Sequence, residues 1–109
     1  MIKDDLIYID HILDCIRKIN DFSNGLSLKE FRKNEMAQDA IIRNIEIIGE
    51  ASKKISIETK ETYNNIPWKE IAGMRDKLIH DYLGVDVNVV WKTVREDIPA
   101  LKRLISGID

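Results

Sequence analysis

The segment DAIIRNIEIIGEASKKI, residues 39–55, is the most informative part of the sequence for predicting the fold. Its apolar residues return every three or four positions, and the pattern begins upstream at Met36. This spacing places them on one face of an amphipathic helix. A renewed helix start is expected at Asn34 or Asp39, after a short break. The sequence therefore predicts a long helix ending near Ser56, with a buried stripe of Ala40, Ile41, Ile45, Ile48, Ala51 and Ile55.

The residues before this helix carry a second amphipathic pattern with start and stop signals. Over residues 3–22 apolar side chains again recur at spacings of three and four, which predicts a first helix. Gly25 suits a left-handed helix end. Ser27 and Glu30 have the spacing of a capping box, which predicts a new start. The expected stripe of the first helix is Leu6, Ile9, Leu13, Ile16 and Ile19, with Ile2, Ile12 and Cys15 nearby.

Beyond the long helix the pattern breaks at ETKETYNNIPW, residues 58–68, which is typical of a loop with at most one helical turn near its start. Pro67 suits the first turn of a third helix. That helix is expected to continue to about His80 or Tyr82, and Gly84 is expected to end it. Its apolar face contains Ile71, Met74 and Leu78.

Asp86 is a candidate cap for a fourth helix, and Pro99 predicts a kink or a restart after Asp97. No period-two strand pattern of any length occurs. We therefore predict an all-α, up-down bundle of four or five helices, formed as a single domain over residues 1–109. The apolar positions of the last helix are Val87, Val90, Trp91, Val94, Ile98, Leu101 and Ile105.

Composition and charge narrow the class of protein. Of 109 residues 44% are hydrophobic and 33% charged, with a net charge of −2, so any contact with nucleic acid needs a local cationic patch. The single Cys15 lies among isoleucines and cannot form an internal disulfide, which favours a core position and a reducing, cytoplasmic setting. The N-terminal stretch MIKDDLIYIDHILD is interrupted by aspartates, which is typical of neither a signal peptide nor a membrane span.

Several kinds of chemistry find no support in the sequence. It has no glycine-rich phosphate loop, no Gly-x-Ser-x-Gly turn and no Cys/His cluster for zinc. His11 is expected on the surface, far in sequence from His80. The long helix carries many carboxylates but no Glu-x-x-His pair, so we expect no metal and interpret them as a solvated face. These carboxylates are Glu35, Asp39, Glu46 and Glu50.

The stretch MRDKLIHDYLG, residues 74–84, is the candidate site. On one helix Arg75 and Tyr82 would share a stripe, whereas His80 would lie about 140° away from Arg75. An ordinary interpretation pairs Arg75 with a carboxylate of the long helix, places His80 in the last turn and buries Tyr82 in the core. The chemical interpretation gathers a cation, a proton carrier and a phenol around a phosphate. Arg75 and His80 could meet where the helix ends or bends, or across a two-fold axis.

The spacing Arg-x4-His-x-Tyr, here Arg75, His80 and Tyr82, resembles the signature of the HEPN domain superfamily. Three segments narrow the resemblance: DAIIRNIEIIGEASKKI, then IPWKEIAGMRDKLIHDYLGVD, then VWKTVREDIPALK. In this order and spacing they look like the HepT-like branch. The resemblance covers residues 36–104 strongly and the first helix weakly.

This resemblance implies an all-α homodimer of HEPN type and a metal-independent endoribonuclease without a cofactor. Arg75 and His80 of two protomers would form one composite catalytic cleft for RNA, with Asp76 and Tyr82 in support. The chain would be the toxin of a type VII-like toxin–antitoxin pair. The partner would be a nucleotidyltransferase antitoxin that silences the toxin by adding AMP to Tyr82.

The implied chemistry suits these residue types. An imidazole that titrates near neutral pH can move a proton, and a guanidinium donates parallel hydrogen bonds to phosphate oxygens. Asp76 or Asp81 is expected to orient His80. The net negative charge and Asp76 favour a second hypothesis, a non-enzymatic helical partner or nucleotide-binding module of a minimal nucleotidyltransferase. Either a phosphate-binding surface or a solubilising face is expected from Arg43, Lys53, Lys54 and Lys77.

Overall fold

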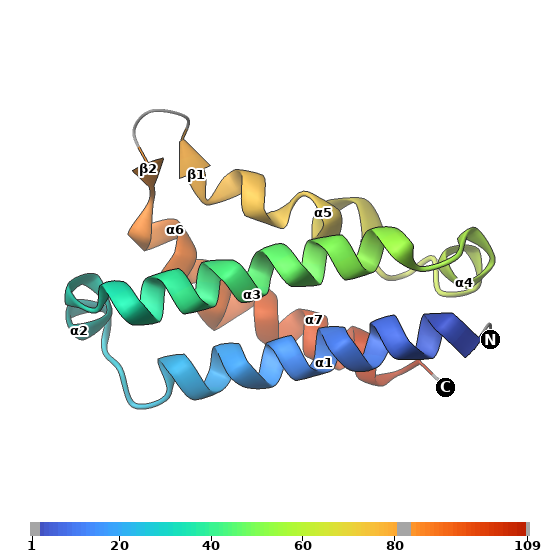
Figure 1. Ribbon diagram of the computed structural model, residues 1–109, viewed down its shortest axis with the longest axis horizontal. Helices are drawn as coiled ribbons and strands as arrows, with labels where there is room; N and C mark the ends of the chain where they lie inside the picture. Colours follow the sequence, from blue (N-terminus) through green and yellow to red (C-terminus); the bar gives the residue numbers. More distant parts are fainter. Residues whose placement is uncertain (1–2, 81–83, 109) are drawn as a thin grey trace.

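The computed structural model describes residues 3–80 and 84–108, and for residues 79 and 80 it describes the backbone alone. Within these ranges the chain is all-α, as predicted, apart from one short antiparallel hairpin (Figure 1). The helices are α1 (Lys3–Ser23), α2 (Leu28–Lys33), α3 (Glu35–Lys54), α4 (Ile57–Thr62), α5 (Trp68–Ala72), α6 (Val87–Lys92) and α7 (Ile98–Ser106). The remaining elements are the 3₁₀ turn η1 (Met74–Lys77), the strands β1 (Ile79–His80) and β2 (Gly84–Val85), and the π-helical turn η3 (Thr93–Asp97).

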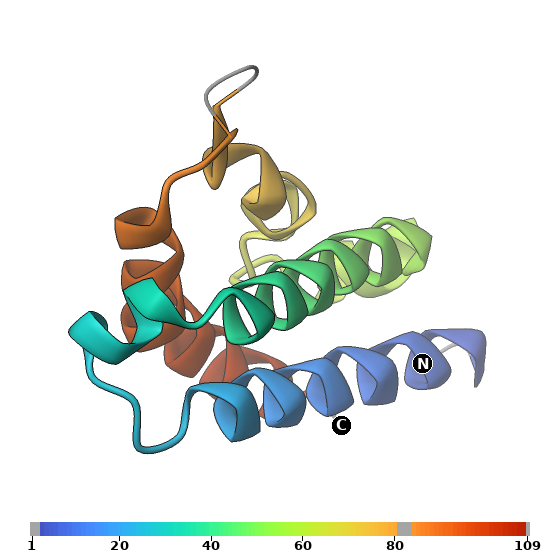
Figure 2. The ribbon, with the colours of Figure 1, turned by 60° about the vertical axis from the view of Figure 1, so that its left-hand side comes forward.

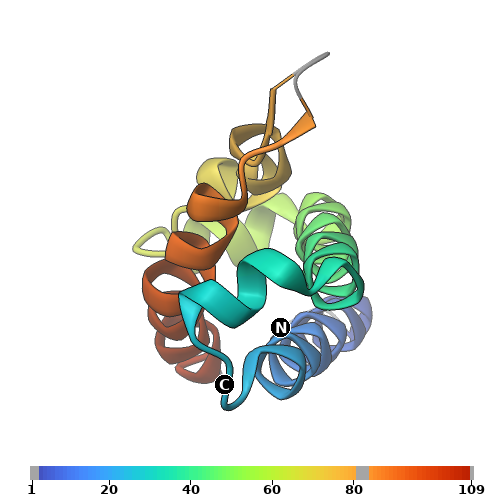
Figure 3. The same cartoon turned by 90° about the vertical axis from the view of Figure 1, so that its left-hand side faces the viewer.

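Two long antiparallel helices, α1 and α3, form one side of the molecule (Figures 1 and 2). Seen end-on in Figure 3, α6, η3 and α7 lie on the opposite side and α2 crosses the near end. The core lies between these layers and is rich in isoleucine, whose branched side chains fill it densely. Its fully buried members include Ile12, Ile16, Ile19, Ile41, Ile45, Ile48, Ile98 and Ile105.

The predicted helix starts are confirmed by their hydrogen bonds. The backbone N–H of Glu30 donates to Ser27 Oγ at 3.2 Å, and that of Ser27 donates to Glu30 Oε1 at 3.0 Å, completing the capping box. Asn34 caps α3 by accepting from the N–H of Ala37 at 3.0 Å, so α3 starts there and not at Asp39. Such caps satisfy amide groups that the first helical turn leaves without partners.

The buried face of α1 is rotated from the expected one. Leu6 was expected in the stripe but is 43% exposed, and Asp5 is buried instead. Met36, expected at the start of the α3 stripe, is 85% exposed. The rotation brings Ile12 and Cys15 fully into the core, which confirms the core position of the thiol.

The prediction of a third helix that continues to His80 or Tyr82 is wrong. Helix α5 begins after Pro67 and ends at Gly73, where the chain tightens into η1. Glycine is a poor residue for a helix interior, which favours the break there. Strand β1 then pairs with β2, with His80 opposite Gly84. Gly84 has a φ of +78° and belongs to this hairpin, so it does not end a helix.

The C-terminal segment has the predicted helix start at Asp86 and the predicted restart of the helix after Asp97. Asp86 caps α6 by accepting from the N–H groups of Asn88 at 3.1 Å and Val89 at 3.3 Å. The π-helical turn η3 comes next, and α7 restarts at Ile98 with Pro99 in its first turn. Proline has no N–H to donate, so its tolerated position is a helix start.

A buried carboxylate joins the beginning of α1 to the beginning of α4. Asp5 Oδ1 accepts from the N–H of Ser56 at 2.9 Å, and its Oδ2 accepts from the hydroxyls of Ser56 at 2.6 Å and Thr59. Burial raises the pKa of Asp5, but the hydrogen bonds from Ser56 and Thr59 outweigh it and hold the pKa below its usual value. This link across more than fifty residues was not predicted from the sequence.

We expect Asp5→Asn to lower the free energy of unfolding by about 2 kcal/mol, the range for hydrogen bonds to a charged group. Because the pKa is lowered by folding, the contribution of Asp5 is complete at neutral pH. It is lost as the pH falls below about 4. Urea unfolding at pH 7 and at decreasing pH checks both effects. Asp4→Asn, at an exposed neighbouring position, is the matched control, and equal effects of the two substitutions would contradict the prediction.

Candidate functional site

Arg75 lies on η1, and a close approach between helices fixes the position of this turn. A Cβ atom at Gly49 of α3 would lie 3.1 Å from the carbonyl oxygen of Ala72, so glycine lets the end of α5 rest directly on α3. On either side of Arg75, Met74 and Leu78 are buried and anchor the chain. The turn is therefore held against α3 while the arginine side chain reaches its surface.

The guanidinium of Arg75 is loosely paired with two carboxylates. Its Nε lies 3.6 Å from Glu46 Oε2, and Nη1 lies 3.8 Å from Asp76 Oδ1. The Arg75 side chain is 48% exposed and that of Asp76 is 81% exposed. The pairing with a carboxylate of the long helix, expected by the ordinary interpretation, is thus present. Long, exposed ion pairs contribute little stability, so a phosphate could displace these carboxylates at small cost.

His80 lies five residues further, at the end of β1, where its backbone is opposite Gly84. Because α5 and η1 end before His80, the angle that one continuous helix would place between Arg75 and His80 does not apply. The prediction that Arg75 and Tyr82 share a stripe of such a helix does not apply either. Asp81 and Tyr82 lie outside the described residues. The structure thus places Arg75 and the His80 backbone on one short segment.

The base of this hairpin is anchored to the core. The N–H of Asp86 donates to the carbonyl oxygen of Leu78 at 2.9 Å, and Leu78 is fully buried. Asp86 also caps α6, so a single residue fixes both the hairpin base and the helix that follows. In Figures 1 and 3 the two strands project from the body of the molecule. The chain thus presents the backbone of strands β1 and β2 away from the bundle on a fixed base.

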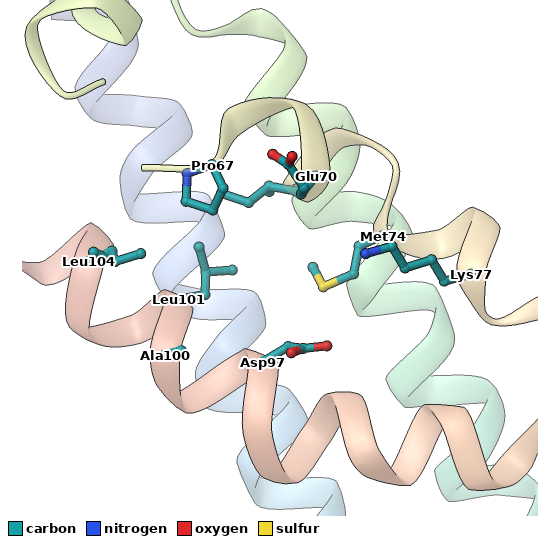
Figure 4. A pocket seen from close by; sticks show the side chains of 9 residues that line it. Pro67, Glu70, Met74, Lys77, Asp97, Ala100, Leu101 and Leu104 are labelled. Carbon is teal, nitrogen blue, oxygen red and sulfur yellow. The ribbon is translucent and has the colours of Figure 1, made fainter. Parts of the chain in front are cut away.

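A small cavity lies on the other side of η1 (Figure 4). Its volume is about 180 Å³, and it separates α5 and η1 from α7. Met74 points into it, and charged groups of Glu70, Lys77 and Asp97 lie at its rim. Met74 and Lys77 of η1 therefore face this cavity, while Arg75 contacts α3.

The other candidate groups have ordinary positions. Glu46 is partly buried, and the other three carboxylates of α3 are exposed, as is His11. Burial raises the pKa of the Cys15 thiol, which disfavours the reactive thiolate. Within residues 3–80 and 84–108, no three or more His, Cys, Asp or Glu side chains come together to hold a metal ion. Over the same ranges no helix has the length and apolar character needed to cross a membrane.

Sequence comparison places the chain among known proteins. It matches the family described as "Ribonuclease HepT-like" over residues 12–108. A Thermococcus cleftensis protein named "Probable ribonuclease HepT" is 50% identical over 95 residues, which are 87% of this chain and 86% of that protein. A Caldanaerobacter subterraneus protein named "Putative RNase" is 42% identical, covering 93% of this chain and 90% of that protein.

A longer relative comes from Methanocaldococcus jannaschii and is named "Gamma-glutamylcyclotransferase and putative RNase". It is 49% identical over 108 residues, which are 99% of this chain but 49% of that protein, so the chain spans about half its length. No solved structure gives a significant match. Because the family match spans most of the sequence and relatives of similar length share 42% and 50% identity with it, the chain belongs to the HepT-like ribonuclease family.

Proposed function

We propose that this chain is a metal-independent endoribonuclease and the toxin of a toxin–antitoxin pair, acting in the cytoplasm. In the proposed site, Arg75 and His80 from the two protomers of a homodimer act together on one RNA strand. The observation that carries the proposal is the half-exposed Arg75 guanidinium, held loosely on a turn beside the projecting hairpin that contains His80.

The proposed reaction requires little beyond these two groups. An imidazole takes the proton of a ribose 2′-hydroxyl, whose oxygen attacks the neighbouring phosphorus, and a second imidazole protonates the departing 5′-oxygen. The guanidinium binds the phosphate oxygens as negative charge develops on them. Each chain supplies one histidine near the motif, so a dimer supplies both proton carriers. The bond from phosphorus to the 5′-oxygen breaks, leaving a cyclic phosphate and a free 5′-hydroxyl.

We propose that this activity is controlled by modification of Tyr82. A nucleotidyltransferase antitoxin would add AMP to its hydroxyl, placing a bulky anion beside the cationic site and repelling RNA. Tyr82 itself lies outside the described residues, but the strands β1 and β2, which flank it in the sequence, project from the bundle, and this supports the proposal. An intact mass that never changes by whole AMP units, with or without the partner, would contradict it.

The alternative is a non-enzymatic partner or nucleotide-binding module of a minimal nucleotidyltransferase. The highly exposed Asp76 beside Arg75 favours it, because a carboxylate there repels RNA phosphate. In this alternative the same motif shapes a protein interface and cleaves nothing.

The proposed function is tested with purified, tag-free and unmodified protein in excess EDTA. We expect cleavage of an RNA oligonucleotide and none of the DNA oligonucleotide of the same sequence, because the attacking 2′-hydroxyl is missing in DNA. The RNA products are expected to end in a cyclic phosphate, which mass spectrometry identifies. Intact RNA after prolonged incubation with a dimeric sample would favour the alternative, and equal cleavage of DNA would exclude the 2′-hydroxyl mechanism.

A further inference from the structure

A groove of about 340 Å³ lies between α1 and α3, the two helices that run side by side in Figures 1 and 2. Tyr8 of α1 and Ile47 and Ala51 of α3 give it an apolar lining. The α3 residues of the lining run from Arg43 to Lys54, which are about 16 Å apart along the helix axis. The groove is thus an apolar channel with a cation near each end of its α3 wall.

The charges of this groove leave it cationic. Arg43 and Lys54 are exposed and make no ion pair within residues 3–80 and 84–108. Glu50 is the one acidic residue among the described residues of the lining, and its Oε1 lies 3.4 Å from Nζ of its neighbour Lys53. Because Lys53 offsets that carboxylate, the charges of Arg43 and Lys54 remain available to an anionic ligand.

Tyr8 offers this groove a surface for a nucleobase. Its ring is partly buried against the core, and its hydroxyl makes no hydrogen bond with any residue in the described part of the chain. Aromatic rings in cationic grooves stack with the bases of single-stranded nucleic acids, with little dependence on sequence. His11, on the next turn of α1, adds an exposed imidazole that can bond to a base or a phosphate.

The groove lies close to the proposed site of cleavage. Ile47 lines the groove, and Oε2 of Glu46, the residue before it, lies 3.6 Å from Arg75 Nε. Successive residues of a helix point about 100° apart, so the groove and Arg75 flank the same turn of α3, about one helix diameter or 10–12 Å from each other. At about 3.4 Å per stacked nucleotide, a strand covers this distance in about three nucleotides. An RNA strand held at Arg75 can therefore reach the groove across the outward face of α3.

We propose that this groove binds the single-stranded RNA about three nucleotides away from the cleaved phosphate, with Arg43 and Lys54 on its phosphates and a base against Tyr8. The proposal rests on the proposed function, because it follows the same substrate beyond Arg75. Charge favours a polyanion as the occupant: the chain has a net charge of −2, yet two unpaired cations line this groove. Of the four basic residues that the sequence leaves between a phosphate-binding surface and a solubilising face, these two are assigned to phosphate.

Binding of an RNA that cannot be cleaved tests the groove independently of catalysis. The probe is a fluorescent single strand in which every 2′-hydroxyl is methylated, so the attacking group is absent. We expect Arg43→Gln and Lys54→Gln each to weaken binding about fivefold at 0.1 M salt, and to lower the slope of log K against log salt by about 0.7, the value for one phosphate contact of a single strand. Lys102→Gln, which removes an exposed cation from α7, is the matched control. Fluorescence anisotropy over a range of salt concentrations measures both quantities.

The contribution of the ring is separable from that of the cations. Tyr8→Leu keeps an apolar side chain but removes the aromatic face, so it is expected to weaken binding at least about fivefold without changing the salt slope. Tyr8→Phe keeps the ring and is expected to bind within about twofold of the parent. Circular dichroism checks that the variants are folded, and the exposed Arg43 and Lys54 decide the test if a substitution at Tyr8 lowers stability.

Three results would overturn the proposal: a parent that does not bind the probe, Arg43→Gln and Lys54→Gln variants that bind it as the Lys102→Gln control does, or a folded Tyr8→Phe that binds as weakly as Tyr8→Leu. Groove variants that bind RNA normally but no longer bind a nucleotidyltransferase partner would also overturn it, and would assign the groove to a protein interface. If the groove variants lose binding as expected and no sample cleaves unmodified RNA, the groove stands and the proposed function fails. If RNA is cleaved and the groove variants bind like the parent, the reverse holds.

Discussion

Replacing Arg75 by alanine is expected to lower the rate constant of RNA cleavage by about 10²- to 10³-fold, the cost of removing one preorganised donor to a developing oxyanion. Arg75→Lys is expected to fall between the parent and the alanine variant, because an ammonium keeps the charge but cannot donate the parallel pair of hydrogen bonds. Single-turnover cleavage of a short labelled RNA measures these rates without interference from product release.

The matched control for this experiment is Arg103→Ala, which removes an exposed arginine from α7 and is expected to leave the rate unchanged. Arg75 is half exposed, so its removal should leave the fold intact, which far-ultraviolet circular dichroism checks. An Arg75→Ala protein that cleaves RNA and arrests growth as the parent does would remove this residue from the mechanism. His80→Ala is subject to the same test.

Mixing parent and inactive subunits distinguishes a shared site from one contained in a single chain. A heterodimer of a parent protomer and an R75A/H80A protomer holds one arginine and one histidine, both on the same chain. If both histidines of the dimer act in one cleft, this heterodimer is inactive, so random exchange with an equal amount of the double variant should lower the activity of the parent to about half. Activity that is unchanged after verified exchange would mean that each chain uses its own two residues.

Helix starts are the part of the fold that the sequence predicts best, because capping is a local interaction. Ser27 and Glu30 bond reciprocally across three residues, and Asn34 and Asp86 bond to amides two or three residues on. Gly25 has a positive φ, as its place after α1 predicts. Each of these signals is complete within a few residues of sequence, so no knowledge of tertiary contacts is needed to interpret it.

Features that depend on distant partners could not be predicted in this way. Asp5 resembles any exposed acidic residue until Ser56 and Thr59 come into contact with it from another helix. The break of the third helix is similar. Met74 and Leu78 are spaced as on a helix and are both buried, yet Met74 lies on η1 and Leu78 between η1 and β1, without a continuous helix. The spacing of apolar residues indicates which side chains are buried, whereas tertiary packing determines the backbone conformation in which they are buried.

The candidate site was predictable in its residues but not in its geometry. Arg75 was identified from the motif, and a carboxylate of the long helix was expected beside it. Which carboxylate it is follows from the contact at Gly49, where α5 rests on α3 one turn beyond Glu46. The sequence contains Gly49, but it does not show that α5 packs against α3 at this position.

The largest expected loss of stability comes from Phe31→Ala. Phe31 is the buried aromatic residue of the short helix α2, is fully buried, and has its ring centroid 5.0 Å from that of Trp91. The guanidinium of Arg95 lies 4.3 Å from the Trp91 ring and donates to the carbonyl oxygen of Leu26 at 2.9 Å. Removing the phenyl ring therefore leaves a cavity at the point where α2, α6 and the preceding loop meet.

Truncating a buried phenylalanine to alanine costs about 3–5 kcal/mol, from lost burial and from the cavity left behind. That is a large share of the stability of a domain of this size, which is about 5–15 kcal/mol. Urea unfolding followed by circular dichroism is expected to show a much lower midpoint with a similar slope. Phe22→Ala is the matched control, because this phenylalanine is 43% exposed at the end of α1 and should cost about 1 kcal/mol or less. Equal losses for the two variants would mean that the contact between Phe31 and Trp91 does not hold α2 to the bundle.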